Sequence, residues 1–360
     1  MRNKRSDKRI VLTGGGSTGH VSVNLALIPR LLRDGWEIYY MGSKDGIERE
    51  LIEEIDGVKY ITIATGKLRR YFSFENLKDV FKVFWGCLQS IFKVRKIRPN
   101  VIFSKGGFVS VPVLFGGFVN RIPSITHESD LTPGLANKLV QPFVKKVFTT
   151  FPETEKYIKS GKGEYIGPVI RDGLFEGKPE SARKFLKIDN DKPVILAMGG
   201  SLGAGIINRV IRENLDSLLQ NYNVVHSCGQ DSLDKSIDKD GYFQFEYINE
   251  NLNHIISLAD MVVTRAGSNA IFEFLFYRKP MLLIPLGLDQ SRGDQIDNAR
   301  SFEREGFGRV LMEEDLSNEM FLKMVNDIYS DREKYEETMK NVDFEDNIGK
   351  IYSEIKKIKL

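Results

Sequence analysis

The feature that most constrains the fold is a pattern that occurs twice: a short apolar segment, a cluster of glycines and then an amphipathic stretch. Arg9–Leu12 leads into Gly14-Gly15-Gly16, and Val194–Ala197 leads into Gly199-Gly200. A strand that feeds a helix through a glycine-rich turn is typical of parallel α/β sheets, which bind ligands at the carboxyl ends of their strands. The sequence therefore predicts an α/β protein with two doubly wound, Rossmann-like domains facing a cleft.

The rest of the chain supports this organisation. Short β-branched segments alternate with longer amphipathic ones, and a polar interval from Lys159 to Pro179 interrupts the alternation before it restarts. A length of 360 residues suits two domains. We predict a first domain over residues 1–165, a second over 166–340, and a C-terminal helix in 341–360 that packs back toward the first domain.

Several classes of protein are excluded. No apolar run approaches the roughly 18–20 residues that cross a bilayer. The two cysteines, Cys87 and Cys228, and the few histidines lack the spacing of metal ligands, and the Asp-x-Asp triplets occupy turns, so neither metal nor cofactor is expected. The second strand ends without the carboxylate that a nicotinamide dinucleotide site requires. No nucleic-acid partner is expected either.

Charge is concentrated in one segment. Ala64–Arg98 carries nine basic and two acidic side chains, although the whole chain is only +3. We expect an anionic membrane surface to bind the basic and aromatic loop within this segment, at Leu68, Arg69, Arg70, Tyr71 and Phe72. The helix that follows has an apolar stripe that includes Val80, Phe81, Phe84 and Phe92, which we interpret as core.

Polar side chains cluster where strands are predicted to end. Ser17, Thr18, Gly19 and His20 close the first glycine-rich loop, and Ser201 lies in the second, where helix-start N–H groups bind anions. Further candidates follow other strands: Lys105, Phe108, His127, Glu128, Asp130, Ser268, Asn269, Glu273, Asp294 and Gln295.

Taken in order and spacing, these motifs resemble the MurG-type enzymes of peptidoglycan synthesis, in glycosyltransferase family 28. The resemblance extends from about Ile10 to the end and includes Ser104–Ser110, His127–Gly134, Gly199–Ala204 and Gly267–Glu273. It implies the glycosyltransferase B fold. It also implies inverting, metal-independent transfer of N-acetylglucosamine from its UDP form to undecaprenyl-diphosphate-linked muramoyl-pentapeptide.

By position, the resemblance implies a role for each candidate. Arg171 and Ser201 are expected at the donor diphosphate, Tyr247 and Ile248 at the uracil, Glu273 at the ribose, and Asp294 and Gln295 at the N-acetylglucosamine. Ser268 and Asn269 add donor contacts, and Ser17, Thr18 and Gly19 touch the donor sugar. Lys105, Phe108, His127 and Asn208 belong to the acceptor side. The catalytic base is His20 or the Glu128/Asp130 pair.

Two other functions fit part of this pattern. A UDP-N-acetylglucosamine epimerase would share the fold and donor pocket but need no membrane patch, and a UDP-sugar sensor would need no acceptor-side polar groups. The basic, aromatic loop favours a transferase, for this acceptor or another lipid-linked one. Such an enzyme is expected at the cytoplasmic face of the bacterial membrane, bound peripherally.

Overall fold

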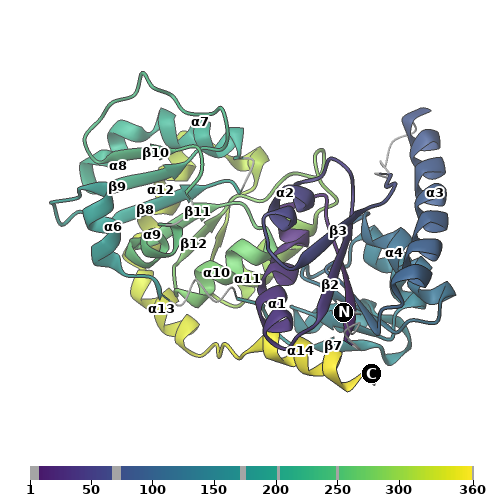
Figure 1. Ribbon diagram of the computed structural model, residues 1–360. Coiled ribbons are helices and arrows are strands. Elements are labelled where there is room, and N and C mark those ends of the chain that lie inside the picture. The colour runs from purple at the N-terminus through teal and green to yellow at the C-terminus, as the bar shows by residue number, and fades with distance from the viewer. Residues whose placement is uncertain (1–7, 67–73, 171–175, 201–202, 249–250, 359–360) are drawn as a thin grey trace. The chain divides into compact units, whose positions relative to one another are not determined.

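The computed structural model describes residues 8–66, 74–170, 176–200, 203–248 and 251–358 (Figure 1). The chain divides into two compact units, and unit 1 comprises Met1–Arg171 together with Glu345–Leu360. Unit 2 comprises Asp172–Phe344. Across the described ranges, no helix is both long and apolar enough to cross a membrane.

Unit 1 is built on a seven-stranded parallel sheet with the order β3-β2-β1-β4-β5-β6-β7. The order reverses between β1 and β4, which is where open α/β sheets bind their ligands. The strands are β1 (Arg9–Thr13), β2 (Glu37–Gly42), β3 (Val58–Thr62), β4 (Val101–Ser104), β5 (Ser124–Glu128), β6 (Lys146–Thr149) and β7 (Gly163–Tyr165).

Helices cover both faces of this sheet. Alternate residues of β1 enter opposite cores, with Ile10 and Leu12 on one side and Val11 on the other. The first core is closed by α1 (Ser22–Arg33), α2 (Ile47–Glu53) and α14 (Asn347–Lys357). The second is closed by α3 (Phe74–Ile97), α4 (Ser110–Val119) and α5 (Leu135–Val140). Short 3-10 helices are η1 (Thr18–His20), η2 (Gln141–Phe143), η3 (Pro152–Tyr157) and η4 (Lys159–Gly161).

The C-terminal helix α14 belongs to unit 1 although it follows unit 2 in the sequence. Ile351 and Ile355 are fully buried in the core beside α1. The Asn347 amide donates to Pro168 O at 2.7 Å, and Arg30 pairs with Asp346 at 2.6 Å. Burial of the apolar side of α14 and these polar contacts hold the end of the chain on the first sheet.

Unit 2 repeats the architecture with a six-stranded parallel sheet in the order β10-β9-β8-β11-β12-β13, which reverses between β8 and β11. Its strands are β8 (Val194–Met198), β9 (Asn223–Ser227), β10 (Tyr242–Phe245), β11 (Met261–Thr264), β12 (Met281–Leu283) and β13 (Gly308–Val310). Its helices are α6 (Pro179–Leu186), α7 (Gly205–Glu213), α8 (Leu215–Asn221), α9 (Leu252–Leu258), α10 (Ser268–Phe276), α11 (Asp294–Arg304), η6 (Glu313–Asp315), α12 (Asn318–Ser330) and α13 (Arg332–Lys340).

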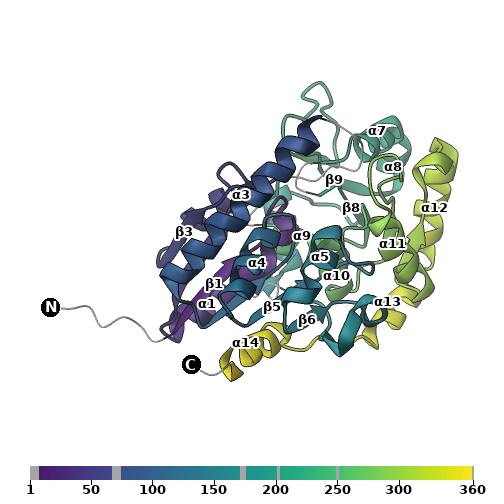
Figure 2. The ribbon, with the colours of Figure 1, turned by 90° about the vertical axis from the view of Figure 1, so that its right-hand side faces the viewer.

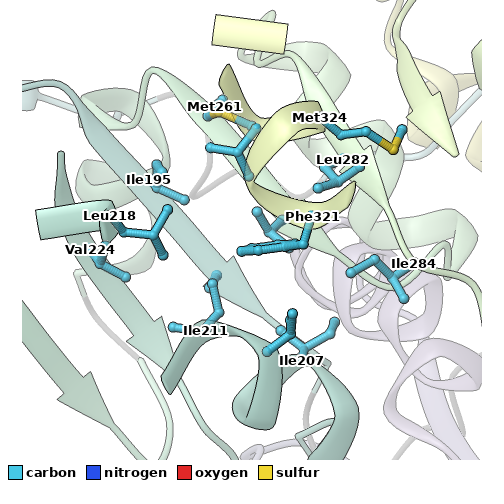
Figure 3. Close-up of a cluster of buried hydrophobic side chains, with 14 of the residues drawn as sticks. Ile195, Ile207, Ile211, Leu218, Val224, Met261, Leu282, Ile284, Phe321 and Met324 are labelled. Carbon is cyan, nitrogen blue, oxygen red and sulfur yellow. The ribbon is translucent and has the colours of Figure 1, made fainter. Parts of the chain in front are cut away.

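One core of unit 2 shows how its layers pack. Phe321 of α12, Ile207 and Ile211 of α7, and Val224 of β9 point toward one another and are all fully buried (Figure 3). Fully burying one such side chain stabilises the fold by about 1.5–3 kcal/mol. The two parallel sheets, each with helices packed on it, confirm the predicted α/β class with two doubly wound domains.

Two local expectations differ from the structure. His127 and Glu128 were expected after the fifth strand, but both lie within β5, at its end. The polar interval after Lys159 contains a short edge strand, β7, that pairs with β6. Its three residues are partly exposed, so no hydrophobic alternation marks them in the sequence.

The interpretation of the α3 stripe as core is wrong. The side of α3 that packs on α4 carries small residues instead: a Cβ on Gly116 of α4 would lie 2.8 Å from Ser90, and one on Gly86 would lie 2.1 Å from Ala64 O. This close approach turns the aromatic side away from the core. The stripe residues are 50–70% exposed: Val80, Phe81, Phe84 and Phe92.

Candidate functional site

The glycine-rich loop of unit 1 connects β1 to η1 and α1 at the point where the strand order reverses. A Cβ on Gly14 would lie 2.3 Å from His20 O, and one on Gly16 would lie 2.4 Å from the Phe108 ring. Both glycines also have positive φ values, 149° and 86°. The loop therefore requires glycine at these positions, because only a residue without Cβ fits this close approach.

A buried carboxylate forms a hydrogen bond with the glycine-rich loop of unit 1. Glu48, at the start of α2, accepts hydrogen bonds from Gly16 N at 3.1 Å, from Ser43 N at 3.0 Å and from Ser43 Oγ at 2.5 Å. The side chain is fully buried. Glu48 thus joins the loop after β1 to the loop after β2, and it positions the backbone that leads to His20.

Sequence reasoning missed Glu48. The second strand ends without an acidic residue that could bind a ribose. Glu48 comes six residues after β2 ends at Gly42, in the first turn of a helix, where acidic residues are common because they stabilise the helix dipole. Its position in the sequence therefore does not distinguish Glu48 from an exposed first-turn glutamate.

Replacing Glu48 by alanine is expected to lower the free energy of unfolding by about 2–4 kcal/mol, because the fully buried carboxylate and its three hydrogen bonds to Gly16 and Ser43 are lost. Urea denaturation monitored by circular dichroism measures this change. Glu50 is exposed on the same helix, and Glu50→Ala serves as the control, with a change within about 0.5 kcal/mol. Equal stability of the two variants would contradict the supporting role of Glu48.

His20 lies where the loops after β1 and β4 meet. The Ser17 hydroxyl and His20 Nδ1 are 2.9 Å apart, and a Cβ on Gly107 would lie 3.2 Å from the His20 ring. The ring is partly exposed. Its orientation is therefore set by a neighbouring hydroxyl and by packing against a glycine, while part of it faces solvent. Thr18 and Gly19 form the 3-10 turn with His20.

The end of β5 carries the acidic candidates. The Glu128 carboxylate is buried and accepts from Asp130 N at 3.0 Å, Gly134 N at 2.9 Å and Asn137 Nδ2 at 2.8 Å. Burial, and then the nearby Asp130 carboxylate, raise the pKa of Glu128. Because its oxygens already accept three hydrogen bonds, Glu128 shapes the β5–α5 loop. Asp130 is partly exposed and is the more accessible carboxylate of the pair.

The acceptor-side candidates of unit 1 differ in exposure. Phe108 is half-buried, with its ring against Gly16. Lys105 and His127 are each only 1% exposed. These two side chains therefore lie inside the protein and not on its surface.

In unit 2 the second glycine-rich loop follows β8. A Cβ on Gly203 would lie 2.2 Å from Cys228 O, so the loop packs directly on the end of β9. A Cβ on Gly200 or Gly205 would meet nothing within 4 Å. One side of the loop and the start of α7 are therefore open to an approaching group.

Asn208 of α7 is committed to the interior of unit 2. Its Nδ2 donates to Cys228 O at 2.8 Å, and its Oδ1 lies 3.0 Å from His226 Nε2. His226 Nδ1 lies 2.8 Å from the Tyr242 hydroxyl. Burial lowers the pKa of His226 to about 3, which keeps the ring neutral. Asn208, expected on the acceptor side, is 6% exposed, and these contacts hold its side chain beneath the loop.

Polar groups follow β11 at the start of α10. Ser268 is the first residue of α10 and is 5% exposed, and Asn269 and Glu273 on the same helix are partly exposed. The preceding loop is held by the buried Asn298 side chain, which donates to Ala266 O at 3.1 Å. A Cβ on Gly267 would meet nothing within 4 Å. The chain just before α10 is thus open on the side that a Gly267 side chain would occupy.

The start of α11 carries the next pair of candidates. Asp294 pairs with Arg292 at 3.2 Å, and Gln295 Oε1 accepts from Leu286 N at 3.1 Å. Arg265, which sequence reasoning did not assign, donates to Ile284 O at 3.0 Å and pairs with Glu313. These contacts tie together the loops that follow β11, β12 and β13.

Elsewhere in unit 2, Tyr247 is 51% exposed while Ile248 is 5% exposed. Seven predicted residues lie outside the described residues: Arg171, Ser201, Leu68, Arg69, Arg70, Tyr71 and Phe72. Among the residues that are described, no group of three or more His, Cys, Asp or Glu side chains is arranged to hold a metal ion.

Comparisons with known proteins agree across both units. Residues 10–149 match the glycosyltransferase family 28 N-terminal domain, and residues 194–354 match the glycosyltransferase family 28 C-terminal domain. The chain is 54% identical over 333 residues to a protein of Geobacillus kaustophilus, covering 92% of this chain and 93% of that protein. It is 50% identical over 351 residues to one of Clostridium tetani, covering 97% and 98%. Both are UDP-N-acetylglucosamine--N-acetylmuramyl-(pentapeptide) pyrophosphoryl-undecaprenol N-acetylglucosamine transferases.

Solved structures share the fold. The crystal structure of MurG from Acinetobacter baumannii has a TM-score of 0.76 at 18% identity, covering 97% of this chain and 99% of that one. A UDP-N-acetylglucosamine 2-epimerase from Neisseria meningitidis has a TM-score of 0.67 at 14% identity, covering 96% and 98%. The fold is thus common to different activities, whereas the sequence matches are specific. The chain belongs to glycosyltransferase family 28.

Proposed function

We propose that this glycosyltransferase transfers N-acetylglucosamine, with inversion, from UDP-N-acetylglucosamine to the N-acetylmuramyl-pentapeptide carried by pyrophosphoryl-undecaprenol, the step that converts lipid I to lipid II. The observation that carries the proposal is identity of 50–54% over more than 90% of the chain to transferases of that name. The glycine-rich loops at the reversal points of both sheets support it, because each is suited to a phosphate-bearing ligand.

Unit 2 is the proposed donor-binding unit. Backbone N–H groups of the loop after β8 and of the start of α10 bind the UDP diphosphate. Ser201 and Arg171 also bind this diphosphate. Glu273, on the first turns of α10, takes the ribose hydroxyls. The uracil is assigned to Tyr247 and Ile248, and the sugar to Asp294 and Gln295 at the start of α11. Ser268 and Asn269 complete the start of α10.

Replacing Glu273 by alanine is expected to weaken UDP-N-acetylglucosamine binding by about 1–3 kcal/mol, because the ribose hydroxyls lose a charged acceptor. Isothermal titration calorimetry measures the change. Glu319 is an exposed glutamate in the first turn of α12, and Glu319→Ala is the matched control. If both variants bind the donor as the parent does, the ribose is held elsewhere.

Unit 1 is the proposed acceptor-binding unit, with His20 as the general base. The acceptor hydroxyl oxygen forms a bond to the anomeric carbon while the bond from that carbon to UDP breaks and leaves its electron pair on the diphosphate. His20 takes the hydroxyl proton. Asp130 is the alternative base. Helix-start N–H groups stabilise the developing charge on UDP, so no metal ion is required.

We also propose that unit 1 docks on the cytoplasmic face of an anionic membrane through α3 and its neighbours. Figure 2 shows α3 lying alongside α4 on unit 1, and α5 contacts α4. Side chains on their outer surfaces are exposed although apolar: Phe81, Phe84, Trp85 and Phe92 on α3, Phe118 on α4, and Leu135 and Leu139 on α5. We call these seven residues the docking face.

A bilayer is the occupant that fits the docking face. The names of the relatives give their acceptor as a pyrophosphoryl-undecaprenol derivative. The long prenyl chain of such an acceptor stays in the membrane. The face is bordered by exposed basic residues, Lys82, Arg95, Lys96 and Lys138. Aromatic side chains enter the headgroup region while each nearby basic residue adds about 1 kcal/mol of attraction to anionic lipid. The basic and aromatic segment Leu68–Phe72, expected from the sequence to bind anionic lipid, lies outside the described residues.

Acceptor-dependent release of UDP tests the proposed function. The protein is incubated with UDP-N-acetylglucosamine and a short-chain lipid-diphosphate muramoyl-pentapeptide, in the presence of a chelator. We expect UDP release only when the acceptor is present. Release of UDP or formation of an epimer without acceptor would instead identify an epimerase, and binding of donor without any turnover would identify a sensor.

A further inference from the structure

Three buried polar atoms lie under the glycine-rich loop of unit 1 without a hydrogen-bond partner in the described part of the chain. They are Lys105 Nζ, Asn24 Oδ1 and His127 Nδ1. The three side chains are 0–1% exposed. Buried polar groups nearly always have partners, so an orphaned ammonium group at this position calls for an explanation.

The backbone brings these residues together. Lys105 follows β4 directly, and the pairing of Ser104 with Thr126 places Lys105 beside His127 on the same face of the sheet. A Cβ on Gly14 would lie 3.2 Å from Lys105 Cβ and 3.3 Å from Asn24 Nδ2. The start of the Lys105 side chain therefore lies beside Gly14, the first glycine of the loop, and Asn24 of α1 lies beside the same glycine.

The electrostatics of Lys105 are unfavourable to the fold. Burial lowers the pKa of Lys105 to about 8, while the Glu128 and Asp130 carboxylates offset part of this effect. Burial, and then the Lys105 charge, lower the pKa of His127, which leaves that ring neutral. The Glu128 oxygens accept three other hydrogen bonds. A positive charge thus remains under the loop at neutral pH without a direct hydrogen-bond partner among the described residues.

We propose that Lys105 is a specificity-determining residue whose buried ammonium attracts the diphosphate of the lipid-linked acceptor onto the loops at Gly14–Gly16 and Gly106–Gly107. The inference rests on the proposed function. Lys105 acts through the electrostatic field under the loop and not by contact, since its side chain is 1% exposed. A charge retained at a cost in stability is typical of functional sites.

Replacing Lys105 by methionine tests this role, because methionine has a similar length and no charge. With the diphosphate-linked acceptor we expect kcat/KM to fall on the order of tenfold, through KM. With an uncharged acceptor, a muramoyl-pentapeptide alkyl glycoside, we expect no change. The affinity for UDP-N-acetylglucosamine, held by unit 2, stays constant.

The matched control is another buried lysine. Burial also lowers the pKa of Lys279 in unit 2, but its Nζ donates to Ser257 O at 2.8 Å. Lys279→Met should leave the ratio of the two acceptors unchanged. Loss of activity by Lys105→Met on both acceptors alike would indicate a structural role and overturn the proposal, as would unchanged kinetics on both.

The stability of the same variant gives an independent readout. In the folded state Lys105 has a pKa of about 8, below its unfolded value of about 10.4. The unfolded chain therefore binds the proton more tightly than the folded chain does. The resulting loss of folding stability is complete below pH 8 and disappears as pH rises toward 10.4. Lys105→Met should raise Tm by several degrees at pH 7 and by little at pH 10. A lower Tm at pH 7 would contradict the uncompensated charge.

A measurement on the parent protein covers the case in which the variant does not fold. The KM for the diphosphate-linked acceptor should rise above pH 8 as Lys105 loses its proton, while the KM for the uncharged acceptor stays level. Parallel pH profiles would overturn the proposal. Absence of acceptor-dependent UDP release at any pH would instead contradict the proposed function itself.

Discussion

Replacing His20 by alanine is expected to lower kcat by roughly 100- to 10,000-fold, the range typical for loss of a general base. The reason is its position: the ring is oriented by the Ser17 hydroxyl at 2.9 Å and packs where the loops after β1 and β4 meet. The affinity for UDP-N-acetylglucosamine should stay constant, because the donor is assigned to unit 2. Steady-state kinetics and calorimetry measure the two quantities separately.

His254 provides the control for this substitution. It is partly exposed in α9, where its Nδ1 accepts from Lys178 N at 3.0 Å. His254→Ala should retain the parent kcat. If His20→Ala also retains it, His20 is not the base, and Asp130→Asn is the variant that then has to lose activity.

Replacing Phe81, Phe84 and Trp85 by serine is expected to abolish binding to anionic vesicles. Their exposed fractions of 66%, 61% and 57% mean that little core is lost, so the protein should remain folded. Transfer of each aromatic side chain from water contributes about 2 kcal/mol. Affinity for vesicles should therefore fall by more than roughly a thousandfold, and activity on a long-chain acceptor should fall with it. Activity on a short-chain acceptor in detergent-free buffer should persist.

Sedimentation with vesicles that contain anionic phospholipid measures the effect. A double variant of exposed apolar residues in unit 2, Phe185→Ser with Met320→Ser, is the control, since these side chains are 45% and 41% exposed but lie outside the docking face. Binding of the triple variant at the parent level would mean that the membrane is reached elsewhere. The loop at Leu68–Phe72 is then the next segment to change.

The sequence alone predicted the architecture because it depends on local patterns. A strand, a glycine-rich turn and a helix can each be identified from a few neighbouring residues, and their alternation defines a doubly wound sheet. The same patterns predicted that residues following different strands meet, because parallel strands end at the same edge of the sheet. His20 and Phe108 were assigned from different segments, and both lie at the meeting of the loops after β1 and β4.

Other features depended on which partner a side chain meets. Glu48 looks like an ordinary acidic residue in a first helical turn, and only the folded chain turns it under Gly16. Lys105 and His127 look like surface groups of a polar loop, yet each is only 1% exposed in the folded chain. Their pKa values follow from that burial and not from the residue types alone.

Helix α3 shows the division most clearly. The 3.6-residue period established that Phe81, Phe84 and Phe92 share one side of a helix, and that much the sequence determined by itself. Which side is buried depended on tertiary packing, because the small residues Gly86 and Ser90 let α4 approach closely and exclude the aromatic side from the contact. Periodicity groups the residues of a face, but only the packed neighbour decides whether that face meets protein or solvent.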